Sequence, residues 1–326
     1  MFDSVWNLSS VTLAGRERPR LDNVSLQIRP GATAVMGASG AGKSSLLSLL
    51  TGFEEPDDGQ LQFAMPETRP PATLPLFWSP QDHGLWSHLT VEQHVGYVLP
   101  ERAKNGRSAM QWLELFELNE LRASLPDSLS QGERSRLAVV RALASEAAVL
   151  VLDEPLVHVD PLLAHRCWRV VDEHLRTHGS TVVFSAHDLG TVMKYARNVV
   201  CLDHGKVTFS DSVDALWHRP PTKELAWLLG PCNWLRPLDI VCEESARELV
   251  SRDYYCVRPS QLALRRNPTG QFVVEAILRT VSLTELRLRE RNSSRSFDVF
   301  VTRLGDGISI GDSVQMTIVP SDRSAE

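Results

Sequence analysis

Short apolar runs alternate with helical patterns over the first two thirds of the chain. Residues 32–36, 147–152 and 181–187 form such runs, and the last of them ends in polar residues. Apolar runs of this length are typical of parallel strands that are buried on both faces of a sheet. Segments 129–146 and 162–179 carry apolar residues at helical spacing. Strands that alternate with helices predict an α/β layer fold.

The pattern changes after about residue 217, where prolines at 219–221 and 233–237 suggest a linker. From Tyr254 onward the chain shows only short runs of alternating apolar and polar residues, which predict strands of a small β-barrel. These runs are 272–277, 285–289, 297–301 and 314–318. We therefore predict an α/β domain over residues 1–230, with a helical subdomain at about 88–145, and a β-barrel over 231–326.

Composition narrows the possible classes of protein. A length of 326 residues suits two domains, and a net charge of −6 with a pI of about 6.0 argues against a nucleic-acid partner. The five cysteines are scattered without a C-x-x-C pair, which indicates reduced thiols. No run approaches the roughly 20 apolar residues that span a bilayer, so we expect any membrane association to depend on other chains.

A glycine-rich segment follows the first apolar run. Gly37 and Gly42 enclose a loop that leads into Lys43 and Ser44, and this spacing fits the phosphate-loop pattern. Backbone N–H groups of such a loop surround phosphate oxygens, the lysine reaches the β- and γ-phosphates, and the hydroxyl ligates Mg²⁺. A glycine-rich turn with an accidental Lys-Ser is the alternative. The residues expected to hold a nucleotide are Gly37, Ala38, Ser39, Gly40, Ala41, Gly42, Lys43, Ser44 and Ser45.

Two carboxylates follow the apolar run 147–152. Asp153 is suited to hold Mg²⁺, directly or through water, and Glu154 to orient or deprotonate an attacking water. A strand that simply exits into an acidic turn is the alternative, and the presence of Lys43 and Ser44 in the same chain makes it much weaker.

A helix start is predicted at Ser130. Ser130 and Glu133 have the spacing of a capping box, which begins a helix without any ligand. A helix N-terminus with Ser130 and Gly132 is also suited to bind an anion, and the two interpretations are compatible.

Together these motifs resemble the ATP-binding subunit of an ABC transporter. Residues 37–44 match its Walker A motif, 149–154 its Walker B motif and 129–133 its LSGGQ signature. Three single residues complete the set, which keeps the family's order and spacing to about residue 230: Gln81 of the Q-loop, Asp160 of the D-loop and His187 of the switch. The resemblance implies a P-loop NTPase cassette with a mixed sheet and a helical subdomain.

The resemblance also implies roles for these residues. The catalytic residues would be Glu154, His187 and Gln81, and the Mg²⁺ ligands would be Ser44, Gln81 and Asp153. Two cassettes would form a head-to-tail homodimer around two ATP molecules, with Ser130 and Gly132 of one subunit facing the γ-phosphate held by Lys43 of the other. Asp160 would also contact nucleotide. The stretch 81–91 resembles importers of sugars, polyamines, iron and oxyanions, and 257–262 with 311–316 resembles their C-terminal TOBE barrel.

We therefore expect an ATPase that powers solute import. It would lie peripherally at the cytoplasmic face of the membrane, on two integral-membrane permease subunits, with a periplasmic or extracellular solute-binding protein as an indirect partner. An alternative is an ATP-dependent regulatory or oxyanion-sensing module with slow ATPase. Gln131 and Glu133 depart from the signature's usual Gly and Gln. No aromatic residue stands at 13–15, where the family stacks adenine, and Trp6 is a weak substitute.

Overall fold

The computed structural model describes residues 4–64, 74–100, 106–240, 254–305 and 307–319. The chain divides into two compact units, Met1–Asp214 and Ala215–Glu326. The predicted domain boundary at residue 230 falls inside the second unit, and helix α7 (Val213–His218) crosses the division between the units.

A six-stranded sheet forms the centre of the first unit, in the order β5-β6-β7-β3-β8-β9. Its first five strands run parallel and β9 runs antiparallel to β8, so the sheet is mixed, as predicted. The strands are β3 (Ala32–Met36), β5 (Leu76–Ser79), β6 (Val149–Leu152), β7 (Thr181–Ser185), β8 (Asn198–Asp203) and β9 (Lys206–Ser212). Every residue of β6 and β7 is buried, which confirms the prediction of central strands.

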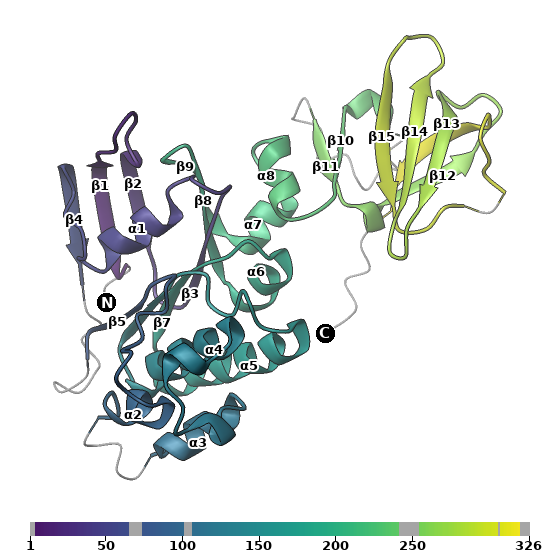
Figure 1. The fold of residues 1–326 in the computed structure, drawn as a ribbon. Coiled ribbons are helices and arrows are strands. Elements are labelled where there is room, and N and C mark those ends of the chain that lie inside the picture. The colour runs from purple at the N-terminus through teal and green to yellow at the C-terminus, as the bar shows by residue number, and fades with distance from the viewer. Residues whose placement is uncertain (1–3, 65–73, 101–105, 241–253, 306, 320–326) are drawn as a thin grey trace. The chain divides into compact units, whose positions relative to one another are not determined.

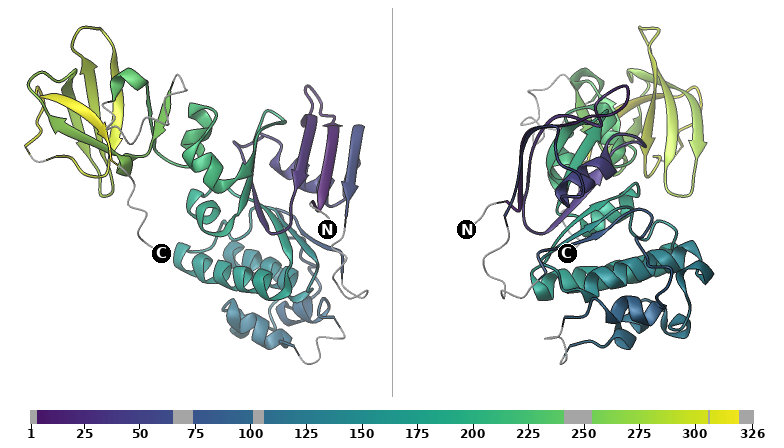
Figure 2. Two further views of the ribbon diagram at one scale, coloured as in Figure 1. Left: turned by 180° about the vertical axis from the view of Figure 1, so that it is seen from behind. Right: turned by 60° about the vertical axis from the view of Figure 1, so that its left-hand side comes forward.

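A smaller antiparallel sheet lies over the central sheet, with helix α1 (Lys43–Leu50) between them (Figures 1 and 2). Its order is β2-β1-β4, from β1 (Trp6–Leu13), β2 (Leu21–Ile28) and β4 (Asp58–Phe63). The core joins alternate residues of β1 and β2 to the leucines of α1 and to β6. The pattern of apolar residues did not predict β1, because a register shift after Leu8 breaks its alternation.

Helices cover the opposite face of the central sheet. Long helices α4 (Gln131–Ala144) and α5 (Pro161–His178) lie side by side there (Figure 1), and both confirm the helical pattern. Before α4, the described part of the predicted helical subdomain contains two short α-helices, α2 (Val91–Gly96) and α3 (Ala109–Leu115). Helix α6 (Leu189–Tyr195) follows β7. No helix among the described residues is long and apolar enough to cross a membrane.

The second unit contains an antiparallel sheet of five strands in the order β12-β16-β13-β14-β15. They are β12 (Leu262–Arg266), β13 (Phe272–Arg279), β14 (Thr284–Glu290), β15 (Ser296–Val301) and β16 (Ser313–Ile318). Alternate residues of these strands pack into one core, as the alternating runs predicted. A short helix, α8 (Lys223–Leu228), precedes this sheet in the chain.

The prediction of a linker at 233–237 is wrong. Residues Asn233–Leu235 form strand β10, which pairs with β11 (Tyr255–Val257). The buried Asn233 side chain donates to Val257 O and Phe300 O and accepts from Phe300 N–H at 2.7 Å. These hydrogen bonds tie β10 to β15, a partnership between distant residues that the local sequence did not reveal.

Candidate active site

The phosphate loop lies between β3 and α1, as predicted. Gly42 precedes α1 with a left-handed backbone (φ 107°), and a Cβ there would lie 2.7 Å from Arg20 O, so no other residue fits without a shift. Helix α1 has no side-chain cap and no acidic residue in its first turn. Its first N–H groups therefore remain available to an anion.

Lys43 lies folded over this loop and is 6% exposed. Its Nζ donates hydrogen bonds to Gly37 O at 3.0 Å and to Ala38 O at 3.1 Å. Burial lowers the pKa of Lys43, while the nearby carboxylates of Glu154 and Asp153 oppose that shift. The ammonium group is thus held between the loop and the acidic end of β6.

Asp153 and Glu154 follow β6, and Ser185 at the end of β7 positions both. Ser185 Oγ donates to Asp153 Oδ1 at 2.5 Å and accepts from Glu154 N–H at 2.7 Å. Asp153 N–H donates to Ser79 O at 2.9 Å, which fixes the turn on its other side. Sequence reasoning did not single out Ser185, although a lone hydroxyl that ends an apolar strand was the available signal.

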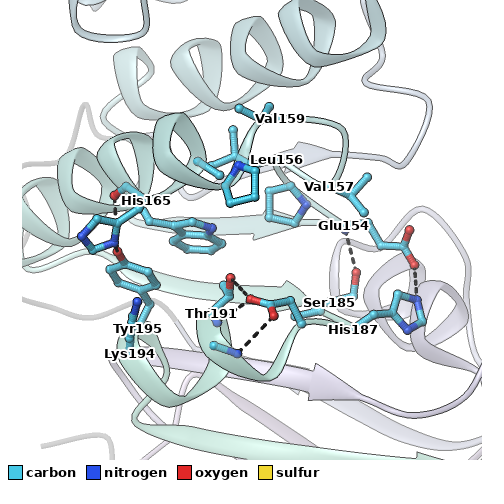
Figure 3. Close-up of a pocket in the computed structure, with 17 residues that line it drawn as sticks. Glu154, Leu156, Val157, Val159, His165, Ser185, His187, Thr191, Lys194 and Tyr195 are labelled. Carbon is cyan, nitrogen blue, oxygen red and sulfur yellow. Dashed lines mark hydrogen bonds and ion pairs between the residues drawn. The ribbon is translucent and has the colours of Figure 1, made fainter. Parts of the chain in front are cut away.

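Glu154 brings the three predicted catalytic residues together. Gln81 Nε2 donates to Glu154 Oε2 at 3.1 Å. His187 Nε2 lies 2.6 Å from Glu154 Oε1, as Figure 3 shows. Gln81 follows β5 and His187 follows β7, so the three side chains come from the carboxyl ends of neighbouring parallel strands. The Glu154 side chain is 17% exposed, so it is sheltered but reachable by water.

The oxygen ligands near Lys43 fit Mg²⁺ only when phosphate oxygens complete the coordination shell of the ion. Among the residues that the structure describes, no group of three or more His, Cys, Asp or Glu could hold a metal ion. Asp153 offers one buried carboxylate, and Ser44 lies exposed in the first turn of α1. Mg²⁺ is commonly bound by one or two such ligands together with substrate phosphates.

The signature segment begins α4 with a closed capping box. Ser130 N–H donates to Glu133 Oε2 at 2.7 Å, and Glu133 N–H donates to Ser130 Oγ at 3.3 Å. The first of these bonds is the main reason that the pKa of Glu133 is lowered. Among the described residues, no hydrogen bond joins Ser130 or Gly132 to the phosphate loop, so the structure of one chain does not bring them together.

The loop after β6 contacts the start of α4. A Cβ on Gly132 would lie 2.7 Å from His158 O, and Leu156 N–H donates to Ser135 Oγ at 2.9 Å. Asp160 begins α5 as its N-cap and accepts from Leu162 N–H and Leu163 N–H. Its carboxylate therefore fixes this loop, and its predicted contact with nucleotide stays a prediction.

Arg141 is a second positioning residue that sequence reasoning missed. It is 3% exposed, and its guanidinium donates to Gly84 O at 2.7 Å and His83 O at 2.9 Å. The guanidinium also lies over the Trp86 ring at 5.0 Å, and burial lowers the pKa of Arg141 to about 10. Helix α4 thus holds the segment that directly follows Gln81.

A cavity of about 390 Å³ lies beside Glu154 and His187, between α5 and α6 (Figure 3). Its far wall is aromatic: Trp168 stacks on Tyr195 with ring centroids 5.2 Å apart, and the Tyr195 hydroxyl lies 2.5 Å from His165 Nδ1. The cavity therefore continues the catalytic site toward α5 and α6.

Trp6 does not lie at the site. It is fully buried, and its Nε1 donates to Leu50 O at 3.0 Å, at the far end of α1 from Lys43. The proposal of Trp6 as a substitute for the adenine-stacking residue is therefore wrong.

The phosphate loop lies at the same edge of a largely parallel sheet as the acidic end of β6. This arrangement defines a P-loop nucleotide-binding protein. Residues 21–157 match the sequence model described as ABC transporter. The sulfate/thiosulfate import ATP-binding protein CysA of Thermosynechococcus vestitus is 32% identical over 282 residues, which cover 81% of this chain and 82% of that protein. The chain belongs to the ABC transporter family.

Other relatives are matched over less of their length. The spermidine/putrescine import ATP-binding protein PotA of Frankia alni is 33% identical over 68% of this chain and 49% of that protein. The putrescine transport ATP-binding protein PotG of Escherichia coli is 33% identical over 65% of this chain and 58% of that protein. The matched part thus spans about half of the length of these polyamine relatives.

Solved cassettes share the fold of the first unit. The dimeric bacterial ABC transporter cassette MJ0796 superposes with a TM-score of 0.56 at 23% identity, covering 64% of this chain and 98% of that one. A post-hydrolysis state of the same cassette, bound to ADP and Pi, gives a TM-score of 0.55. The ABC cassette fold with its mixed sheet is therefore confirmed.

Proposed function

We propose that this chain is the ATP-hydrolysing subunit of an ABC importer. The observation that carries the proposal is the convergence of Gln81 and His187 on the Glu154 carboxylate, next to Asp153 and the loop that holds Lys43. A structural ion pair would not need three strand ends beside an uncapped helix N-terminus. The import ATP-binding proteins named above support the same function.

One chain supplies the phosphate-binding half of the proposed site. The N–H groups of residues 37–44 bind the phosphates, and Lys43 leaves its two carbonyl partners to contact the β- and γ-phosphates. Glu154 orients the attacking water or accepts a proton from it. Gln81 and His187 hold the two carboxylate oxygens of Glu154. Mg²⁺, held by Ser44, Asp153 and Gln81, would neutralise charge on the phosphates.

The second half of the site is proposed to come from a second copy of this chain. Ser130 and Gly132 lie at the N-terminus of α4, and among the described residues no hydrogen bond joins them to the phosphate loop, so we assign them to the nucleotide of a partner. Asp160 lies in the adjoining loop. In a homodimer, each of two ATP molecules would be bound by the phosphate loop of one subunit and the signature segment of the other. The dimeric cassette of the same fold supports this proposal.

The remaining partners follow from the importer proposal. Two permease subunits would hold the cassettes at the cytoplasmic face of the membrane, with a solute-binding protein on the other side. The relatives import sulfate, thiosulfate, spermidine or putrescine, so the cargo is proposed to be a small charged solute. The cargo would contact the permease, and this chain would supply the energy.

The decisive experiment replaces Glu154 with Gln. The amide keeps the shape but removes the negative charge and the proton acceptor, so ATP hydrolysis should fall at least a hundredfold while ATP still binds. The ATP-bound dimer should then accumulate, because each nucleotide joins two subunits and is not cleaved. Size-exclusion chromatography with Mg²⁺-ATP and a phosphate-release assay measure both effects.

The matched control is Glu114→Gln, an exposed carboxylate on α3. It should leave the rate and the elution volume unchanged. A Glu154→Gln protein that stays monomeric at saturating ATP would contradict the shared site, and one that hydrolyses ATP at the wild-type rate would contradict the assignment of Glu154.

The second unit is proposed to be a TOBE-like barrel with a separate core. Its five-stranded sheet packs alternate residues of its own strands together. A fragment that ends at Trp217 should therefore fold and bind ATP with unchanged affinity. Isothermal titration of the fragment and the full chain checks this. A fragment that is insoluble with and without nucleotide would show that the two units share a core.

A further inference from the structure

Two segments far apart in the sequence support the phosphate loop from outside. Gly205 N–H, in the turn between β8 and β9, donates to Ala41 O at 3.0 Å. A Cβ on Gly42 would lie 2.7 Å from a main-chain oxygen of the loop between β1 and β2. The β1–β2 loop and the β8–β9 turn therefore both reach the start of α1, beside the phosphate loop.

The β1–β2 loop has no room for a base-stacking side chain at Gly15. A Cβ there would lie 2.2 Å from Arg18 O, closer than any real contact. The loop bends this tightly because Arg20 Nε donates to Ala14 O while its guanidinium pairs with Glu54. Trp6 is fully buried, so neither Trp6 nor a side chain at position 15 is placed to stack on a nucleobase.

Arg18 offers such a contact. Its Nη1 lies 2.7 Å from His204 Nδ1, which joins the β1–β2 loop to the β8–β9 turn and restrains the guanidinium. Both residues are exposed, and the His204 side chain is 70% exposed. Of the loop's other arginines, Arg20 is held by Glu54, and Arg16 has no described side-chain partner.

We propose that Arg18, oriented by His204, is the nucleobase contact of the ATP site. This inference rests on the proposed ATPase function and specifies how the base is held. A guanidinium is planar and stacks on aromatic faces, and its charge adds a cation–π attraction. Arg18 takes the place of an aromatic residue that Gly15 excludes, and His204 is a positioning residue.

The test separates binding of the base from binding of the phosphates. Mant-ATP is displaced from the full chain by either ATP or inorganic tripolyphosphate, and its fluorescence reports the displacement. The proteins compared are wild type, Arg18→Ala, Arg18→Lys, His204→Ala and the control Arg16→Ala. Arg18→Ala should weaken ATP binding about tenfold and leave tripolyphosphate binding unchanged. Arg18→Lys should lose most of the same affinity, because it keeps the charge but not the plane.

His204→Ala should weaken ATP binding about threefold, again with no effect on tripolyphosphate, and Arg16→Ala should match wild type. If Arg18→Ala or His204→Ala lost affinity for ATP and for tripolyphosphate equally, the Arg18–His204 pair would only fasten the two segments. That result would overturn the inference. Unchanged ATP affinity in Arg18→Ala would also overturn it. A wild-type chain that binds neither ligand would instead contradict the proposed function itself.

Discussion

Two helices of the first unit begin in opposite ways. Helix α1 starts after Gly42 with no side-chain cap and no acidic residue in its first turn. Helix α4 starts at Ser130 with both bonds of a capping box, and the box is closed by the charged Glu133. The first N-terminus keeps its N–H groups open for an anion, whereas the second satisfies two of them within the chain.

The difference shows how the two proposed halves of the site are prepared. An uncapped N-terminus lacks a contribution of about 0.5–2 kcal/mol that a capping side chain would give, so α1 is suited to gain from a bound phosphate. At α4, an incoming γ-phosphate would compete with the Glu133 carboxylate for Ser130 N–H. In the proposed dimer, both halves would therefore exchange hydrogen bonds: Lys43 would leave Gly37 O and Ala38 O, and Ser130 N–H would leave Glu133.

The largest effect should come from Lys43→Ala at the open N-terminus. The variant loses the only lysine at the phosphate loop, so ATP affinity should fall about a hundredfold and hydrolysis should reach background. Mant-ATP titration and phosphate release measure this. Lys223→Ala, an exposed lysine on α8, is the control and should behave as wild type. Turnover of Lys43→Ala near the wild-type rate would refute the phosphate-loop assignment.

A smaller effect is expected from Ser130→Ala at the closed N-terminus. Removing the capping hydroxyl should lower the free energy of unfolding of the first unit by about 1 kcal/mol and reduce ATP-driven dimerisation. Ser108→Ala is the matched control, because Ser108 caps α3 through the same box with Gln111. It should cost a similar stability with no effect on dimerisation. If both variants dimerise alike, Ser130 has no role beyond its cap.

The smallest change should come from Glu133→Gln, which makes the α4 box chemically identical to the Ser108–Gln111 box. Stability should change by less than about 0.5 kcal/mol, because an amide oxygen accepts the same hydrogen bond. Turnover at limiting protein should rise about two- to fivefold, since one negative charge leaves the proposed partner-facing end. Rates at several protein concentrations check this, and an unchanged rate would show that Glu133 does not oppose dimerisation.

Local patterns predicted the phosphate loop and the acidic strand end. Glycine spacing, a preceding apolar run and a following helix all lie within about 20 residues, so Gly37 to Ser44 could be assigned without the fold. Gln81, Glu154 and His187 could be placed at one edge of the sheet, because the carboxyl ends of parallel strands meet there. Strands β3, β6 and β7 and both long helices followed from the same patterns.

The errors concern residues whose partners are distant in the chain. Trp6 was considered for the base, but it is buried behind α1, because β1 crosses under that helix. The stretch 233–237 was interpreted as a linker, but Asn233 is bonded to residues of β11 and β15. Neither outcome is encoded in the neighbouring residues, because each depends on which strands pair.

The sequence by itself determined which chemical groups this protein carries and on which element each one lies. Hydrophobic period, glycine spacing and capping residues act over a few positions, and these are local properties of the chain. Only the tertiary structure decided that Ser185 positions both carboxylates, that Arg141 holds the segment after Gln81, and that Arg18 meets His204. Those hydrogen bonds join residues 31 to 186 positions apart, and they form only once the sheet has fixed the distances between its strand ends.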